Sequence, residues 1–281
     1  MKKNTKEAHQ KYFLINGQIL DTTKFNPSDI TKTTTIYEVI RVIDGIALFA
    51  EEHLQRLNKS LVLLGHEPKL NEKMILQEIY KLIKINQCNN YNLKVIANKL
   101  EDPQPNIFIF FIESNYPDKA YYTSGIHTIL YSAERDNPNA KVILKNFRDK
   151  IDEAIKSAGA YEALLLNKEG EITEGSRSNI FLVKDHVLYT APADKVLKGI
   201  TRTRIIDLSK TLNISFEEKP ISVDFLKSAD GLFMTGTSPK VLPIASVDNI
   251  LYDSTSNPIV LKLQDAYDQL IGHYIGLKKE N

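Results

Sequence analysis

Three short stretches of the sequence combine glycine with hydroxyl or acidic side chains in patterns that could build a chemical site. Glycine allows the backbone to approach a ligand closely, and the N–H groups at the start of a helix attract anions. Gly199-Ile200-Thr201 and Gly236-Thr237-Ser238 are therefore candidate phosphate-binding turns. Helix starts of this kind are more often simple caps, so neither turn identifies a phosphate site by itself.

The third stretch holds a single carboxylate. Glu174 lies in Ile-Thr-Glu-Gly-Ser-Arg-Ser, shortly before the apolar run Asn179–Val183, which predicts a buried strand. A glutamate in such a place is most often a surface residue of a hairpin. The role of Glu174 therefore depends on which other residues of the chain lie next to it.

Composition limits the class of protein. The chain has 281 residues, of which 42% are hydrophobic and 25% charged, as in a globular protein of one large or two moderate domains. A net charge of +1 argues against a nucleic-acid-binding protein. The apolar runs are too short to span a membrane, and the histidines show no metal-ligand spacing. Cys88 is the single cysteine, which excludes an internal disulfide and favours a reducing, cytoplasmic location.

Periodicity predicts an α+β arrangement for the first third of the chain. Asn16-Gly17 and Asp44-Gly45 are expected to form hairpin turns. Leucines from Leu54 to Leu64 repeat at helical spacing, and Gly65 is expected to end that helix. The other elements expected here are a helix near 75–83 and strands near 36–42, 91–98 and 106–112.

A polar segment rich in Asn, Pro and Ser, residues 113–124, is expected to link two domains. We therefore expect a small α+β domain at residues 1–119 and a larger domain at residues 120–281. The elements expected in the larger domain are strands near 126–131, 162–167, 179–183, 186–190 and 232–235, and helices near 147–158, 200–212, 222–229 and 263–271.

Several separated motifs together resemble the class IV aminotransferases, the fold-type-IV enzymes that use pyridoxal phosphate. The N-terminal motifs are Tyr-Glu-Val-x-Arg-Val-x-Asp-Gly at 37–45 and Glu-His-x-x-Arg-Leu at 52–57. The later motifs follow in the family's order: Glu-x-x-x-x-Asn-Ile-Phe at 174–181, Tyr-Thr-Ala-Pro at 189–192, Leu-x-Gly-Ile-Thr-Arg at 197–202 and Gly-Thr at 236–237. The resemblance covers about residues 35–245. The family includes branched-chain and D-amino-acid aminotransferases and aminodeoxychorismate lyase.

This resemblance implies a two-domain α+β fold. The small α/β N-terminal domain would be followed by a larger C-terminal domain with a β-barrel-like sheet, and the cofactor would lie between them. Pyridoxal 5'-phosphate is the implied cofactor, a small amino acid and a 2-oxo acid are the implied substrates, and family members are usually homodimers. The sequence gives no indication of a nucleic-acid, membrane or metal partner.

The resemblance also implies roles for single residues. Glu174 matches the carboxylate that keeps the cofactor's pyridine nitrogen protonated. Lys141 matches the lysine that binds the cofactor covalently, because it lies 18 residues before Gly159, the start of a Gly-x-x-Glu step. Lys145, one helical turn later, is the alternative lysine.

Arg56 matches the arginine that binds the cofactor's phosphate, with the backbones of Ile200 and Thr201 and the hydroxyl of Thr237. Leu197 matches an apolar residue that packs against the cofactor ring. The implied cofactor-binding set also contains Asn179, Gly199 and Gly236. On the substrate side the candidates are Tyr37 and Lys94, although a strand tyrosine is more often part of the core. His53 is interpreted as a helix-surface or packing histidine and not as a ligand.

Three regions depart from the family pattern. Thr31–Thr35 replaces a glycine-rich Asp-x-Gly stretch. Asn146 stands where branched-chain enzymes carry a tyrosine. Lys94, Asn98 and Lys99 occupy the strand on which D-amino-acid enzymes use arginine and histidine. The sequence therefore favours neither specificity.

The leading hypothesis is an aminotransferase that moves an amino group from a small amino acid to a 2-oxo acid, with Lys141 transferring the proton. The alternative is a lyase that resembles aminodeoxychorismate lyase and releases pyruvate without an acceptor. A third hypothesis, motivated by the threonine-rich segment and Asn146, is a degenerate member that binds the cofactor or a partner without turnover. The substrate, its handedness and the oligomeric state stay open at this point.

Overall fold

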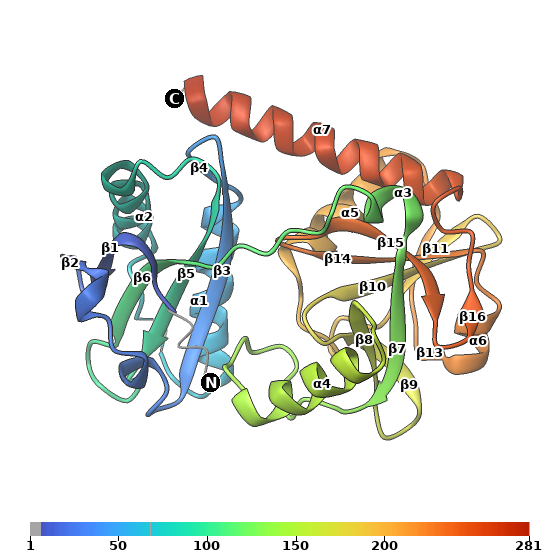
Figure 1. Cartoon of the computed structure of the whole chain (residues 1–281), viewed down its shortest axis with the longest axis horizontal. Coiled ribbons are helices and arrows are strands. Elements are labelled where there is room, and N and C mark those ends of the chain that lie inside the picture. The colour runs from blue at the N-terminus through green and yellow to red at the C-terminus, as the bar shows by residue number, and fades with distance from the viewer. Residues whose placement is uncertain (1–6, 68, 281) are drawn as a thin grey trace. The chain divides into compact units, whose positions relative to one another are not determined.

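The computed structural model describes residues 7–67 and 69–280, and the chain divides into two compact units. Unit 1 contains residues up to Asn115, the short segment Ala140–Ile143 and the C-terminal residues from Gly272. Unit 2 contains Tyr116–Asn139 and Leu144–Ile271. Each unit combines helices with a sheet (Figure 1), which confirms the predicted α+β class. The expected domain boundary between residues 119 and 120 stays a prediction.

Unit 1 is built on a six-stranded antiparallel sheet with the order β2-β1-β6-β5-β3-β4. Its strands are β1 (His9–Ile15), β2 (Gln18–Asp21), β3 (Thr35–Ile43), β4 (Ile46–Ala47), β5 (Tyr91–Asn98) and β6 (Asn106–Ile112). The β1–β2 hairpin turns at Asn16 and Gly17, which have φ of 49° and 79°. Glycine tolerates positive φ without strain and asparagine does so better than most residues, so the predicted turn is confirmed. Two short 3₁₀ helices follow β2, at Thr22–Lys24 and Pro27–Ile30.

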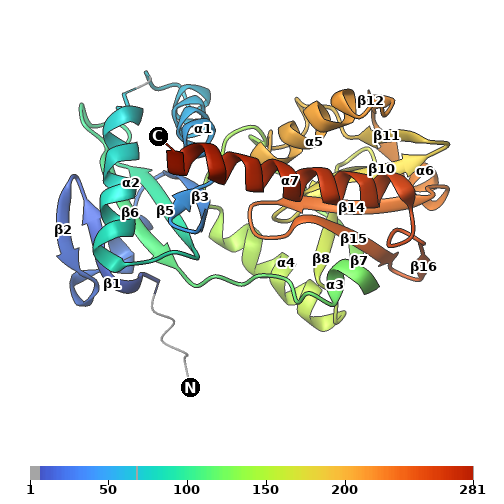
Figure 2. The same cartoon turned by 90° about the horizontal axis from the view of Figure 1, so that it is seen from above.

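Two helices, α1 (Ala50–Leu63) and α2 (Glu72–Asn86), pack against this sheet (Figure 2). Their apolar stripes contribute to one core with residues of β3, β5 and β6. Leu54, Leu57 and Leu61 are buried in that core, as their helical spacing predicts. Gly65, with φ of 85°, follows the end of α1.

The strand β3 presents alternate residues to the two faces of its sheet. Ile36, Ile40 and Val42 belong to the core beneath α1 and α2. Tyr37 belongs to a second apolar cluster, with residues of β1, β5 and β6. The intervening residue Glu38 shares the parity of Ile36 and Ile40, so a carboxylate lies on the helix-covered face.

The segment Ala140–Ile143 joins unit 1 by pairing with β3. The Tyr37 N–H donates to the Lys141 carbonyl oxygen at 3.1 Å, and the Ile143 N–H donates to the Thr35 carbonyl oxygen at 3.0 Å. An isolated antiparallel bridge between Ile36 and Val142 completes this contact. Lys141 is thereby fixed beside the strand that carries Tyr37 and Glu38.

Unit 2 is built on a curled, mixed sheet with the order β12-β11-β10-β14-β15-β7-β8-β9-β13, and β16 pairs with β15 (Figure 1). Its strands are β7 (Ile126–Ser132), β8 (Glu162–Leu166), β9 (Glu171–Gly175), β10 (Asn179–Lys184), β11 (Val187–Thr190), β12 (Phe216–Glu218), β13 (Ile221–Ser222), β14 (Gly231–Gly236), β15 (Lys240–Val247) and β16 (Ile250–Leu251). Ile180, Leu182, Met234 and Leu242 contribute to the apolar core on one face. This sheet positions Glu174 at the end of β9 and Asn179 at the start of β10.

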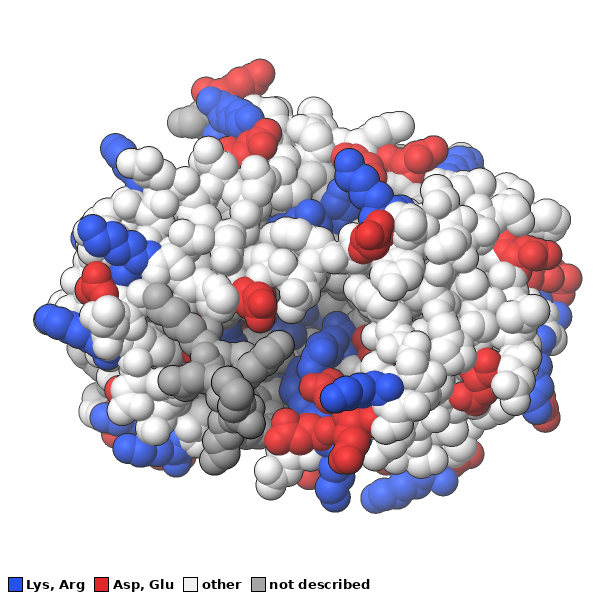
Figure 3. Space-filling view, in the orientation of Figure 1, with Lys and Arg blue, Asp and Glu red and all other residues white. Residues whose placement is uncertain are grey.

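The helices of unit 2 are α3 (Tyr121–Ser124), α4 (Lys145–Ser157), α5 (Ile200–Thr211), α6 (Val223–Lys227) and most of α7 (Pro258–Glu280). Gly159 follows α4 with φ of 62°, in agreement with its expected place after that helix. None of the helices in the described part of the chain is long and apolar enough to cross a membrane. On the face drawn in Figure 3, acidic and basic side chains are mixed, in keeping with the net charge of +1.

Candidate functional site

Unit 1 contains a buried ionic cluster of Glu38, His53 and Arg56, which we call the Glu38 cluster. Glu38 is fully buried. Arg56 Nε donates to Glu38 Oε1 at 2.7 Å, and Arg56 Nη2 donates to Oε2 at 2.6 Å. His53 Nδ1 lies 2.7 Å from Oε2. Residues 53 and 56 are three positions apart on α1, and this spacing places both side chains on one face of the helix, toward β3.

The cluster keeps Glu38 ionised. Burial by itself raises the pKa of the Glu38 carboxyl, but the charge and hydrogen bonds of Arg56, followed by those of His53, outweigh burial and lower this pKa to about 2. Burial lowers the pKa of His53, and the bond to Glu38 opposes this effect only in part. A neutral His53 therefore donates its Nδ1 proton to the carboxylate.

The sequence analysis assigned a role to Arg56 but missed its two partners. A signal was present, because Glu38 has the strand parity of Ile36, Ile40 and Val42. A carboxylate on an otherwise apolar strand face requires a cation and hydrogen-bond donors. His53 is buried, which agrees with the packing alternative and not with the helix-surface one, and in addition it holds Glu38.

Lys141 is anchored both to β3 and to the helix that carries Arg56. Its N–H donates to Ser60 Oγ at 3.1 Å, and the Ser60 hydroxyl donates to the Arg56 carbonyl oxygen at 3.0 Å. Ser60 is fully buried. The Lys141 ammonium lies 4.8 Å from the centroid of the Tyr37 ring. Unit 1 thus brings together three predicted site residues, Arg56, Lys141 and Tyr37.

Lys94 lies on the Tyr37 face of the sheet. Its Nζ is 5.4 Å from the Tyr37 ring centroid and 5.9 Å from the Phe110 ring centroid, distances at which a cation is attracted to an aromatic face. It also forms an ion pair with Glu7 at 3.2 Å. Lys94 therefore lies beside Tyr37, with its ammonium paired to Glu7.

Two residues at the departures from the family pattern have structural partners. Buried Asn98 donates from Nδ2 to the Asp29 carbonyl oxygen at 2.6 Å. Thr35 Oγ1 lies within hydrogen-bond distance of the carbonyl oxygens of Ile30 and Thr33, at 3.0 and 2.9 Å. These bonds support the threonine-rich segment against the sheet. The backbone of Lys145 begins α4 in unit 2, and its side chain lies outside the described part of the structure.

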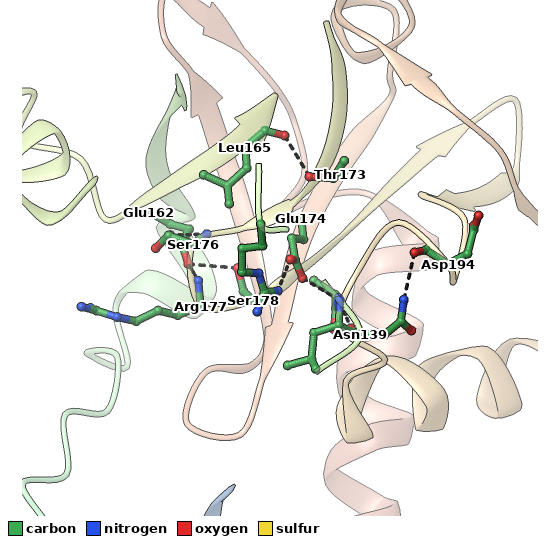
Figure 4. Close-up of polar contacts among 12 residues, drawn as sticks. Asn139, Glu162, Leu165, Thr173, Glu174, Ser176, Arg177, Ser178 and Asp194 are labelled. Carbon is green, nitrogen blue, oxygen red and sulfur yellow. Dashed lines mark hydrogen bonds and ion pairs between the residues drawn. The ribbon is translucent and has the colours of Figure 1, made fainter. Parts of the chain in front are cut away.

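In unit 2, Glu174 is buried and held at both carboxylate oxygens. Arg135 Nη2 donates to Oε1, and the N–H of Leu197 donates to Oε2 at 3.1 Å. Figure 4 shows the carboxylate at the centre of these contacts, with Asn139 and Asp194 nearby. Arg135 comes from the turn-rich stretch after β7 and was not predicted. An unpaired buried carboxylate at 174 would have required such a cation, but the sequence does not say which one.

The turn that carries Glu174 is organised by a second carboxylate, Glu162 of β8 (Figure 4). Five donors lie 2.6–3.3 Å from its oxygens: the N–H groups of Ala163, Ser176 and Arg177 and the hydroxyls of Ser176 and Ser178. Gly175 is required here because a Cβ would overlap with Ser178 Oγ. The small residues after Glu174 therefore close this turn around Glu162.

The start of α5 fits an anion. Gly199 is the N-cap residue and supplies no side chain, so no side chain caps the first N–H groups of the helix. Asn179 Nδ2 donates to the Leu197 carbonyl oxygen at 2.9 Å, and a Cβ on Gly199 would overlap with Asn179 Oδ1. Thr201 is buried with its hydroxyl 3.3 Å from the hydroxyl of Tyr267. The structure thus brings the predicted residues Asn179, Leu197, Gly199 and Glu174 into one neighbourhood.

The second glycine turn follows β14. Gly236 is the last residue of that strand and pairs with Lys240, so Thr237 lies in the turn that leads to β15. Thr235, the residue directly before Gly236, is buried. Its hydroxyl has no hydrogen-bond partner among the described residues. Most buried polar groups in native structures have a hydrogen-bond partner, so this hydroxyl is an exception.

Metal chemistry finds no support in the described residues, which contain no group of three or more His, Cys, Asp or Glu able to hold a metal ion. Unit 1 contributes an amine, Lys141, and a guanidinium, Arg56, and unit 2 contributes a buried carboxylate, Glu174, and the N–H groups at the start of α5.

Comparison with known proteins gives a consistent result. The family described as Amino-transferase class IV matches residues 35–247. A D-alanine aminotransferase of Bacillus licheniformis is 28% identical over 84% of this chain and 87% of its own length. A protein named probable branched-chain-amino-acid aminotransferase, from Rickettsia bellii, is 29% identical over 88% of this chain and 91% of its own length.

A solved structure supports the same fold. The branched-chain amino acid aminotransferase from Escherichia coli has a TM-score of 0.80 at 24% identity, covering 94% of this chain and 95% of that chain. At this identity the likeness concerns the fold alone. It confirms the predicted two-domain α+β fold.

Proposed function

Because the chain belongs to the class IV aminotransferase family, we propose that it uses pyridoxal 5'-phosphate to transfer an amino group from a small amino acid to a 2-oxo acid. The observation that carries the proposal is the placement of Lys141, whose backbone is bonded both to β3 and, through Ser60, to the helix of Arg56. An amine and an arginine anchored to one framework suit the aldehyde and the phosphate of this cofactor.

The residues fit the cofactor in their chemistry. Its phosphate is a dianion, and Arg56 and the start of α5 provide a cation and backbone N–H donors. Its ring nitrogen is basic, and Glu174 provides a buried carboxylate. When bound, pyridoxal phosphate withdraws electrons from the substrate Cα and so lowers the barrier to removal of the Cα proton.

Glu174 is proposed to accept the hydrogen bond of the ring N–H and to keep that nitrogen protonated. Arg135 and the Leu197 N–H already bind one carboxylate oxygen each, which fixes the direction of the side chain. Two fixed oxygens allow the carboxylate to act without reorganising in the reaction. The turn built around Glu162 fixes the backbone that directly follows Glu174.

Lys141 would hold the cofactor through Nζ, and the same amine would serve as the base that takes up the substrate Cα proton and gives it back. The backbone anchors of Lys141 leave its side chain as the moving part. The Tyr37 ring, 4.8 Å from Nζ, limits where that side chain can travel.

The phosphate is proposed to bind Arg56, the backbone N–H groups of Ile200 and Thr201, and Thr237. Gly199 and Gly236 would allow the backbone to come close to the anion, and Leu197, whose carbonyl is held by Asn179, is proposed to pack against the ring. Tyr37 and Lys94 are proposed to face the substrate carboxylate. We also propose that the protein is cytoplasmic and forms a homodimer.

The lysine assignment can be tested directly. We expect the purified protein to absorb in the visible range and, after borohydride reduction and digestion, to carry the phosphopyridoxyl group on Lys141. Lys141→Ala should lose both the absorbance and the label, and Lys145→Ala is the matched control that should keep both. A label on Lys145, or colour that survives in Lys141→Ala, would show that the assignment is wrong.

The reaction can be tested with the same protein. Amino donors including D- and L-alanine, L-leucine, L-glutamate and aminodeoxychorismate are offered with and without a 2-oxo acid. Transfer that requires the 2-oxo acid supports the aminotransferase. Pyruvate formed from aminodeoxychorismate without any acceptor would identify the lyase instead, and cofactor binding without turnover would identify the degenerate member.

A further inference from the structure

Glu38 is a buried carboxylate in the Tyr-Glu-Val-x-Arg motif, and the proposed function leaves it without a role. It lies at zero exposure on the face of β3 that α1 and α2 cover, among Ile36, Ile40 and Val42. A buried charge is costly unless it is paired and hydrogen-bonded. The fold offsets that cost with two side chains of α1, and one of them is the proposed phosphate ligand Arg56.

The contact between Glu38 and Arg56 is a two-point contact. Nε meets Oε1 at 2.7 Å and Nη2 meets Oε2 at 2.6 Å. Two parallel bonds fix the plane and the direction of a guanidinium, whereas one bond would leave it free to pivot. The contact uses the edge of the guanidinium that carries Nε and Nη2. The carboxylate therefore determines where the remaining N–H groups of Arg56 point.

His53 fixes the carboxylate in turn. Its Nδ1 lies 2.7 Å from Glu38 Oε2, the oxygen that also accepts from Arg56 Nη2. His53 and Arg56 are neighbours on one face of α1, so a shift of one is transmitted to the other through Glu38. The three side chains form one rigid support within unit 1.

We propose that Glu38 is a positioning residue for phosphate binding: it holds the Arg56 guanidinium in the orientation in which Arg56 binds the phosphate of the cofactor. This inference rests on the proposed function. Because Glu38 offsets part of the positive charge of Arg56, its contribution is orientation and not positive potential. A guanidinium can serve a carboxylate on one edge and a phosphate on another, which a lysine ammonium cannot do in a fixed geometry.

The test compares two probes, pyridoxal phosphate and pyridoxal, which differ only in the phosphate. Dissociation constants for both are measured on the cofactor-depleted full-length protein. In Glu38→Gln the amide nitrogen cannot accept a hydrogen bond from Arg56, so one of the two points of contact is lost at constant volume. We expect the preference for pyridoxal phosphate over pyridoxal to fall by roughly tenfold or more, with pyridoxal affinity unchanged. Inorganic phosphate should lose affinity by the same factor.

Glu51→Gln is the matched control. It is the same glutamate-to-glutamine change as at position 38. Glu51 lies on α1, and its carboxylate binds Tyr274 and Lys278 instead of Arg56. Its preference for the phosphorylated probe should equal that of the wild type. In an Arg56→Met background Glu38→Gln should cause no further loss, and an equal loss in that background would overturn the inference.

Other outcomes separate the inference from the proposed function. If Glu38→Gln keeps the wild-type preference, the positioning role is wrong while cofactor binding stands. If the wild type itself does not prefer pyridoxal phosphate to pyridoxal, the proposed function fails. Should Glu38→Gln not fold, Glu38→Asp retains the charge with a shorter side chain. The preference of Glu38→Asp for pyridoxal phosphate over pyridoxal should then fall by less than about tenfold, and a preference equal to that of the wild type would overturn the inference.

Discussion

Two buried carboxylates, Glu38 in unit 1 and Glu162 in unit 2, are satisfied in different ways. Glu38 binds the side chains of Arg56 and His53, both from a helix that packs over its strand. Glu162 binds backbone N–H groups and hydroxyls, most of them from the turn that follows β9. One carboxylate therefore ties a helix to a sheet, and the other closes a turn.

The two carboxylates differ in which part of the molecule they fix in place. A carboxylate paired with a cation fixes the direction of that cation, so its effect extends to whatever the cation binds. A carboxylate surrounded by neutral donors fixes the backbone that supplies them. Glu38 thus orients Arg56 toward any ligand that Arg56 binds. Glu162 fixes the backbone of the turn next to Glu174.

The largest effect is expected when the Glu38 cluster loses its cation. Arg56→Met leaves a carboxylate buried without its charged partner and should lower the free energy of unfolding of the cofactor-depleted protein by about 3–5 kcal/mol. Denaturant unfolding measures this change. The double variant Glu38→Gln/Arg56→Met buries no charge and should recover part of the loss. A single variant as stable as the wild type would show that the ion pair does not stabilise unit 1.

A smaller effect is expected at Glu162. In Glu162→Gln an amide nitrogen replaces one accepting oxygen, so donors of the turn lose a partner, which should cost about 1–3 kcal/mol. Hydrogen exchange at the amides of Ser176 and Arg177 should rise. The control is Glu169→Gln, in an exposed turn, which should change the stability by less than about 0.5 kcal/mol. Exchange that stays slow in Glu162→Gln would contradict the assigned role.

The smallest effect concerns pH and His53. Burial lowers the pKa of His53 below 6.5, Glu38 opposes this, and Arg56 and Lys141 add to the lowering. Because the unfolded chain binds the proton first, stability should fall as the pH decreases from about 6.5, by at most about 1.4 kcal/mol per pH unit. His53→Gln keeps a donor for Glu38 and should remove this slope between about pH 7 and pH 5.5.

The control for the histidine effect lies in the same cluster. Because the pKa of Glu38 falls from 4.5 to about 2, Glu38 affects stability chiefly below about pH 4.5 and does not contribute to the slope between about pH 7 and pH 5.5. An unchanged slope in His53→Gln would assign the pH dependence to other groups.

Much of the fold was predictable because its signals are local. The Asn16-Gly17 turn, the leucine stripe of α1 and the strand β10, which contains Ile180, depend on residues that are close in the chain. The turn after Glu174 was recognised as a special stretch, but its organisation around Glu162 was not. The contacts with Glu162 join the turn to a different strand, and the periodicity of the sequence does not predict such contacts.

The sequence by itself determined the α+β elements and the order of the family motifs, because periodicity and turn chemistry act over a few residues. Only the tertiary structure decided that Lys141 meets Ser60, 81 residues away, and that Arg135 meets Glu174, 39 residues away. A buried charge specifies that it needs a partner of opposite sign, but the path of the whole chain decides which residue provides it.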